Sequence, residues 1–300
     1  MTEPDAEKLL TIVGLGADPS EIQQMFRVSL DYPDKVTTIN TFPFYIQSES
    51  AACVIEDVMY VMGAGKSPYK ELSMLNKSGE WQKLADMIAG RRRHCVTVID
   101  STIYVLGGWR DADERTLDGV MSYNTVTNTW STTGKLVHAV ECAASVNHNN
   151  VIYLFGGTES DNRAAAYVQE YTPTNNNCSL MSSPMPCAYN LLRAVLWNTS
   201  AILLGRWNCV IYDFEKQTWQ ERKQFKTDVV HFGLVLHRER IYVAGGGFDV
   251  KSKEKKITWT NTDEIRSVPV VDIVENKSAT WKLHAEVPQP GNVDAFGVMR

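Results

Sequence analysis

The chain has 300 residues, of which 22% are charged, with a formal net charge of −5 at pH 7 and a sequence pI near 5.7. This acidic balance argues against a nonspecific nucleic-acid binder, which needs a basic surface to contact phosphates. No stretch approaches the roughly 18 consecutive apolar residues of a membrane-spanning helix, so the sequence predicts no helix that crosses a membrane and no membrane partner.

The amino-terminal residues 1–8 are polar and acidic, unlike a signal peptide, and we expect them to be the end of a linker. A chain of 300 residues could hold two ordinary domains, but a ring of repeats is a single one, so the repeats described below predict one domain over residues 9–300. This domain begins with the segments 10–14, 26–32 and 35–41, which are predicted to be the second, third and fourth strands of one four-stranded unit.

A short phrase then recurs along the chain, consisting of an apolar run that ends in one or two glycines. Its best copies are 103–108, 152–157 and 241–246, and weaker copies end near Gly63, Gly205 and, at the amino end, Gly14. The first glycines of the copies lie 40 to 49 residues apart. A regular period of this length predicts a repeat architecture.

Each repeat contains the signals of four strands. An apolar run such as 95–99 precedes the phrase across a short polar turn and predicts a hairpin. After the phrase come a variable loop and an alternating strand, predicted at 119–124, 209–213 and 270–274. A tryptophan follows the third strand in four repeats: Trp81, Trp130, Trp219 and Trp281. The longest insertion, residues 246–269, is predicted to be a solvated loop.

These repeats resemble the kelch motif, in which a hydrophobic strand and a double glycine are followed by a spaced tyrosine and tryptophan. The repeat with Gly107, Gly108, Tyr123 and Trp130 matches best, whereas a later repeat has only Gly205 followed by Arg206. The resemblance covers nearly the whole chain and implies an all-β fold, a six-bladed kelch β-propeller with one four-stranded blade per repeat.

The two ends of the chain predict how the ring closes. Residues 295–300 resemble only the first strand of a blade, whereas the amino end begins at the second strand. We therefore expect the N- and C-terminal strands to pair within one blade, which removes open strand edges. The alternative is an open fragment of a longer propeller.

No motif predicts catalysis. The segment 63–67 resembles part of a phosphate-binding loop, but Tyr60 replaces the required glycine and Pro68 excludes the helix. The histidines have no short metal-ligand spacing and no nucleophile elbow is present, so we expect no catalytic residue, metal or cofactor. The six cysteines form no CxxC pair, which together with the absence of an export signal predicts a cytoplasmic protein.

Function is expected on the propeller face where the loops after the glycines meet the loops that enter each first strand. Arginine and large aromatic residues are enriched at protein-binding hot spots, and these loops contain both. Five arginines on one face suggest an anion-accepting mouth, and hence a protein or peptide partner that carries acidic groups. The predicted partner-binding residues are Tyr45, Arg92, Arg93, Trp109, Arg110, His138, Tyr189, Asn190, Arg193, Arg206, Trp207, His231 and Phe248.

The resemblance extends to the kelch domains of BTB-kelch proteins, and it implies the substrate-recognition domain of an adaptor for a cullin-based ubiquitin ligase. The BTB half, through which such an adaptor would reach the cullin, is absent from this sequence. One alternative is an actin-binding or scaffold kelch protein. Another is a small-molecule enzyme of kelch fold, such as a sialic-acid epimerase, which would need a carboxylate-binding arginine in the axial funnel.

Overall fold

The computed structural model describes residues 9–14, 24–32, 35–39, 49–64, 66–251, 257–288 and 293–299. In these ranges the regular structure is almost entirely antiparallel β-strand. The exceptions are one short helix, α1 (Val270–Val274), and 3-10 turns at Asp111–Asp113 and Lys223–Phe225. No helix in the described part of the chain has the length or apolar character needed to cross a membrane.

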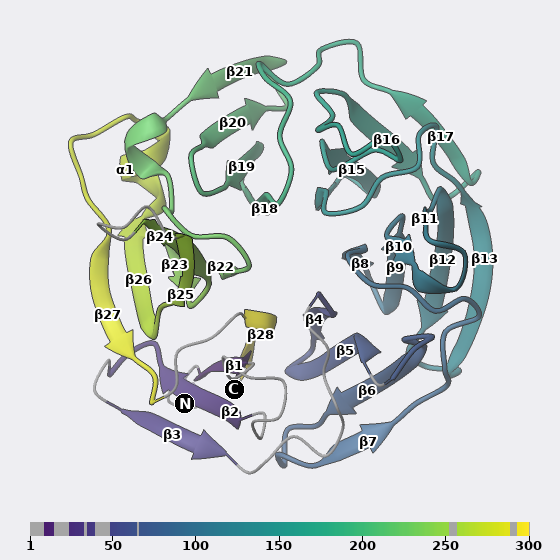
Figure 1. Cartoon of the computed structure of the whole chain (residues 1–300), viewed down its shortest axis with the longest axis horizontal. Coiled ribbons are helices and arrows are strands. Elements are labelled where there is room, and N and C mark those ends of the chain that lie inside the picture. The colour runs from purple at the N-terminus through teal and green to yellow at the C-terminus, as the bar shows by residue number, and fades with distance from the viewer. Residues whose placement is uncertain are drawn as a thin grey trace, which may run out of the picture.

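The strands form four-stranded sheets arranged around a central axis (Figure 1). Five sheets, which we number blades 1 to 5, each come from one continuous stretch. Blade 1 consists of β4 (Ala51–Ile55), β5 (Val58–Ala64), β6 (Glu71–Leu75) and β7 (Trp81–Lys83), and blade 2 of β8 (Cys95–Ile99), β9 (Thr102–Leu106), β12 (Gly119–Asn124) and β13 (Thr129–Lys135). Blade 3 consists of β14 (Ala144–His148), β15 (Val151–Phe155), β16 (Val168–Thr172) and β17 (Asn177–Leu180), and blade 4 of β18 (Arg193–Trp197), β19 (Ser200–Leu204), β20 (Cys209–Asp213) and β21 (Thr218–Glu221). Blade 5 consists of β22 (Gly233–His237), β23 (Arg240–Ala244), β26 (Glu264–Pro269) and β27 (Lys282–Glu286).

A sixth four-stranded sheet combines the two ends of the chain. β28 (Val293–Met299) pairs with β1 (Leu9–Gly14), which continues to β2 (Gln24–Ser29) and β3 (Val36–Ile39). We call it the composite sheet. Its innermost strand, β28, contacts β4 of blade 1 on one side and β22 of blade 5 on the other. The expected all-β propeller is confirmed, whereas the predicted count of six blades and the predicted closure of the ring stay predictions.

Apolar side chains fill the space between neighbouring blades. One cluster joins Leu106 and Val120 of blade 2 to Ile152, Leu154 and Tyr171 of blade 3, and all five are 1% exposed or less. Because both faces of each blade are covered in this way, no sheet can bury its apolar residues without its neighbours. Tyrosine hydroxyls in the core retain partners, since the Tyr171 hydroxyl donates to the Thr133 carbonyl over 2.9 Å.

Two predictions for blade 5 were wrong. Residues 270–274 form helix α1 rather than the third strand, which instead is β26. Pro269 stands at the amino end of α1, where its missing amide proton costs nothing, and Val270 and Ile273 bury one face of the turn. The insertion is not a plain loop either, because β24 (Gly247–Lys251) and β25 (Ile257–Asn261) pair as a hairpin. Blade 2 has a shorter one, β10 (Trp109–Arg110) with β11 (Arg115–Thr116).

The double glycines are required by backbone geometry. Gly107 and Gly108 have φ of 62° and 100°, in the region that disfavours other residues. A Cβ on Gly107 would lie 2.4 Å from the carbonyl oxygen of Val140, which belongs to the loop entering the next blade. Gly156 has the same conformation, and a Cβ there would lie 2.3 Å from the Tyr189 carbonyl oxygen. These turns therefore allow adjacent blades to approach closely.

We predict that Gly107→Val or Gly156→Val destabilises the fold by about 1–3 kcal/mol, because a β-branched side chain meets both a left-handed φ and a backbone clash. Thermal or urea unfolding measures the loss. The control is Gly119→Ala, whose Cβ would meet nothing nearer than 3.6 Å. Equal stability of the Gly107 variant and the control would contradict the argument.

Deletion of residues 295–300 is predicted to abolish soluble, cooperative folding. The deletion removes most of β28, including the fully buried Met299, and exposes the edge of β1. Each lost buried side chain costs about 1.5–3 kcal/mol. Calorimetry and size-exclusion chromatography provide the measurement, with deletion of residues 1–8 as the control. A truncated protein that melts like the parent would show that β28 does not hold the ring closed.

Candidate functional site

The loops that enter the innermost strands share one geometry around the axis. Each has a residue in the left-handed region two positions before the strand, with φ between 53° and 84°. These five residues, which we call the axial mouth, are Glu49, Arg93, Cys142, Leu191 and His231. Side chains at equivalent positions of blades 1 to 5 therefore converge on one end of the axis.

Backbone hydrogen bonds connect the axial mouth from blade to blade. The Arg93 amide donates to the Glu49 carbonyl over 3.0 Å, and the Cys142 amide to the Arg93 carbonyl over 2.9 Å. The Leu191 amide continues the series by donating to the Cys142 carbonyl over 3.1 Å. Inside this ring is a cavity of about 200 Å³, lined by the axial mouth and by the innermost strands of the five blades.

The loops after the glycines join the same face. Arg92 and Trp109 exchange two backbone hydrogen bonds of 3.0 and 2.8 Å, and Glu141 pairs in the same way with Thr158. The sequence-based expectation that the two loop sets meet is therefore met in blades 2 and 3. Val230 and Gly247 form the corresponding pair in blade 5.

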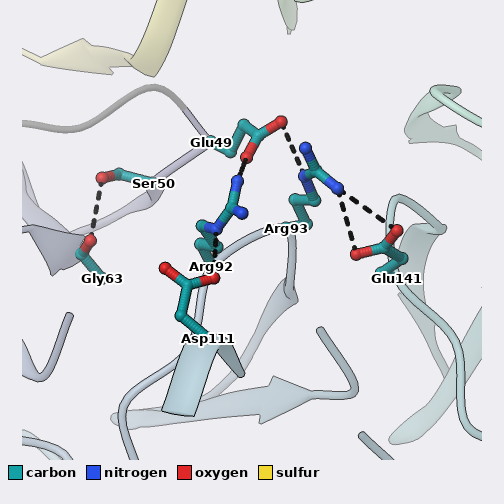
Figure 2. A network of polar contacts seen from close by, with 7 residues as sticks. All are labelled: Glu49, Ser50, Gly63, Arg92, Arg93, Asp111 and Glu141. Carbon is teal, nitrogen blue, oxygen red and sulfur yellow. Dashed lines mark hydrogen bonds and ion pairs between the residues drawn. The ribbon is translucent and has the colours of Figure 1, made fainter. Parts of the chain in front are cut away.

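Two of the predicted arginines belong to a charge network with three carboxylates (Figure 2). Arg92 lies between Glu49, to which it donates a hydrogen bond, and Asp111, whose Oδ1 is 2.9 Å from its Nε. Arg93 pairs with the other Glu49 oxygen at 2.6 Å and with Glu141 at 3.4 Å. The network links blades 1, 2 and 3.

The network changes the ionisation of its members. Burial opposes the charge of Arg93, but the hydrogen bond and charge of Glu49 outweigh it and raise the pKa of the guanidinium. Burial raises the pKa of Glu141, and the nearby charge of Arg93 opposes that shift only in part. Arg93 therefore stays charged and is held in place by carboxylates on both sides.

Two further arginines are also paired. Arg110 donates two hydrogen bonds to Asp113 within its own loop. Arg206 lies 3.3 Å from Asp249 of the neighbouring blade, and its guanidinium carbon is 4.6 Å from the centroid of the Trp207 ring. The expectation of an open basic mouth is thus not supported, because four of the five arginines pair with carboxylates. For the fifth, Arg193, no carboxylate in the described part of the chain forms an ion pair.

The other predicted residues have diverse environments. His138 stacks on Tyr167 with ring centroids 4.6 Å apart, and Asn190 donates to the Thr158 hydroxyl. Tyr189 and Phe248 pack partly into the apolar core, so their rings are only partly available to a partner. Tyr45 lies outside the described residues.

Sequence reasoning missed the acidic half of this surface and the ring under His138. Glu49, Glu141 and Asp111 hold the arginines, and Tyr167 supports the histidine. A signal for the pairing of Glu49 with Arg93 was present. Aligning the loops by distance from the strand places these two opposite charges at the same position of adjacent blades.

Two neighbours of the arginines are structural. Arg91 is 3% exposed and donates to the carbonyl oxygens of Gly107 and Gly119 over 2.9 and 2.8 Å. Burial lowers its pKa to about 10, and the charge of Arg110 adds to the shift. His94 is buried at the position that Leu192 and Phe232 occupy in blades 4 and 5. Burial, reinforced by the charge of Arg91, lowers the pKa of His94 to about 3.

The fold and the repeated glycine turns define a β-propeller of kelch type, and comparisons with known proteins agree. The chain is 24% identical over 246 residues to Kelch-like protein 35 of Mus musculus, a match that covers 81% of this chain. It is 26% identical over 257 residues to Kelch-like protein 25 of Xenopus tropicalis, a match that covers 79% of this chain. The chain spans 42% and 44% of those relatives' own length. It is also 29% identical over 152 residues to Kelch repeat and BTB domain-containing protein 4 of Macaca fascicularis, covering 49% of this chain and 28% of that protein. The chain is therefore a β-propeller whose repeats resemble those of kelch-like proteins and of the kelch domains of BTB-kelch proteins.

Two other comparisons matched proteins outside the kelch-like relatives. The family model for N-acetylneuraminate epimerase matches residues 40–183. A solved structure described as "Structure of YjhT" superposes with a TM-score of 0.70 at 14% identity, covering 84% of this chain and 88% of that one. At this identity the superposition supports the fold alone.

We predict that His94 makes stability depend on pH. Its folded-state pKa of about 3 lies below the ordinary value of 6.5. Between these two pH values the histidine is protonated in the unfolded chain but neutral in the folded protein. This contribution is fully present above pH 6.5 and is lost as the pH falls from there towards 3. His94→Leu should flatten that part of the stability profile, measured by urea unfolding at several pH values. Parallel profiles for variant and parent would contradict the assignment.

Proposed function

We propose that this propeller is a protein-interaction module whose partner binds the face that carries the axial mouth. The observation that carries the proposal is Trp207, which is 59% exposed at the seam between blades 4 and 5. Arg206 lies against its ring, and the Lys226 ammonium is 5.3 Å from the ring centroid. An exposed indole flanked by cations is typical of a binding hot spot.

Other exposed apolar side chains support the same face. Ile88 and Val137 are 51% and 46% exposed and occupy the same position in the loops that enter blades 2 and 3. The His138–Tyr167 stack follows directly after Val137. We infer that the partner contacts apolar and aromatic side chains that lie between ion pairs formed within the propeller, rather than a uniformly basic surface. An acidic partner is therefore not required by this part of the face.

The kelch-like relatives give this surface a biological setting. We propose that the chain supplies the substrate-recognition domain of a BTB-kelch adaptor for a cullin-based ubiquitin ligase, with the BTB part contributed by sequence outside these 300 residues. We further propose a cytoplasmic location, since all six cysteines are free thiols. An actin-binding or scaffold role would use the same face with a different partner.

A small-molecule enzyme is the second candidate. The match of residues 40–183 to the N-acetylneuraminate epimerase model and the presence of an axial cavity favour it. NMR of N-acetylneuraminate with added protein tests this candidate directly. Epimerisation at a rate proportional to protein concentration would support the enzyme and displace the adaptor proposal.

The interaction module is tested by capture of partners on immobilised protein, followed by quantitative mass spectrometry. We expect Trp207→Ala to lose the specific partners while its melting temperature stays unchanged, because the side chain is mostly exposed. The matched control is Tyr32→Ala, which removes a 65% exposed aromatic at the turn between β2 and β3. Undiminished capture by the Trp207 variant, or equal loss in the Tyr32 control, would overturn the proposed surface.

A further inference from the structure

Glu170 is unusual for its place in the fold. It lies on β16 of blade 3, directly opposite Tyr153, which is the third residue before the first glycine of its repeat. In the other four numbered blades the residues paired with this position are Met74, Ser122, Ile211 and Ser267. None of them is charged. The packing of a blade therefore does not need a carboxylate here, and Glu170 calls for another explanation.

The seam between blades 3 and 4 places aromatic rings beside this carboxylate. Residues directly opposite each other in an antiparallel pair have their Cβ atoms about 5 Å apart, so the Tyr153 side chain starts next to that of Glu170. Tyr153 packs against the same apolar cluster as Tyr212 of blade 4. The charge of Glu170 acts on both tyrosines, since it adds to burial in raising the pKa of each hydroxyl.

Further rings extend this wall away from the axial mouth. Phe214 follows β20, and its ring centroid is 4.6 Å from that of Tyr153 and 5.1 Å from that of Tyr212. His148 stacks on Phe214 with centroids 4.2 Å apart. Because β14 is entered at the axial mouth and ends at His148, these rings lie towards the opposite face. The seam therefore has an aromatic wall at the end of the propeller that the proposed Trp207 surface does not use.

No cation of the two blades neutralises Glu170. Both blades lie within the described range 66–251, and no lysine or arginine in that range forms an ion pair with it. Burial raises the pKa of the carboxyl, and a hydrogen bond from the uncharged Ser179 offsets this only in part. Lys216, which follows β20, is engaged by Asp213 over 2.8 Å. A partly buried carboxylate without a counter-charge is unfavourable for the fold and favours the arrival of a cation.

We propose that the seam between blades 3 and 4 binds the ammonium group of a lysine side chain on a protein partner, held by Glu170 and the neighbouring tyrosine rings. The carboxylate supplies the opposite charge, and aromatic rings attract cations. The four-carbon stem of lysine can cover apolar surface of the seam while its head reaches the carboxylate. A guanidinium fits less well, because Ser179 already uses part of the carboxylate that a two-pronged pair would need. The site goes beyond the Trp207 surface and does not depend on it.

The test uses the intact protein and three probes: N-acetyl-lysine methylamide, its neutral counterpart acetylated on the side-chain nitrogen, and butylammonium. Binding is followed by the NMR signals of isotope-labelled glutamate carboxyl groups and tyrosine rings. We expect the lysine derivative to bind more tightly than butylammonium and the neutral probe not to bind. Glu170→Gln should weaken binding of the lysine derivative at least about tenfold, as expected for loss of a charge-assisted pair. The melting temperature should be preserved, because glutamine keeps the shape and can still hydrogen-bond to Ser179.

The matched control is Glu286→Gln, which removes an exposed carboxylate on β27 of blade 5 and should bind the lysine derivative normally. Tyr153→Ile places the residue that blade 4 has at this position and should weaken binding about two- to fivefold through loss of the ring. Equal binding by the Glu170 variant and the parent, binding of the neutral probe, tighter binding of butylammonium, or displacement by equimolar sodium would overturn the proposal. Trp207→Ala should bind the lysine derivative normally, so this site and the proposed partner surface can fail separately.

Discussion

The structure depends on the way each blade is tied to the next at the axis. Backbone hydrogen bonds run from Arg93 to Glu49, from Cys142 to Arg93 and from Leu191 to Cys142, and every residue in this series has a left-handed conformation. Such a conformation is costly for residues other than glycine and persists only where the surroundings enforce it. Here the enforcing surroundings are the glycine turns, because Gly108 donates to the Val140 carbonyl in the loop that enters the following blade.

The repeated elements could be predicted from the sequence because their causes are local. A run such as 103–106 is apolar because it is covered on both faces, and Gly107 follows because no Cβ fits there. Blade 5 shows the limit of this reasoning. The run 270–274 is apolar enough for a strand, but β26 ends at Pro269 and the following residues turn into a helix that packs on the same core. Apolar character alone does not distinguish these outcomes.

The candidate site was predictable in position but not in character. Placing arginines on one face required only the repeat period, and the structure brings Arg92, Arg93 and Arg193 to that face. Their charge balance depends on which side chains lie across a blade boundary. Glu49 and Arg92 are 43 residues apart in sequence, so composition and local sequence pattern do not predict that they pair. Comparison of equivalent positions between repeats recovers part of it.

The same comparison separates residues that maintain the ring from residues available for function. A side chain that recurs in kind at one position, such as the small residues that begin β4, β14 and β22, reflects a packing requirement shared by the blades. A side chain that departs from its equivalents without gaining a partner has no such structural reason. Among the described residues no carboxylate pairs with Arg193, which meets this condition at the axis. Trp207, at the rim, meets a different criterion, which is the exposure of a large apolar side chain. Trp207 is 59% exposed, whereas most large apolar side chains of this fold are buried in the core. In a repeat protein, function is therefore best sought where one repeat differs from the others and the difference is not absorbed by packing.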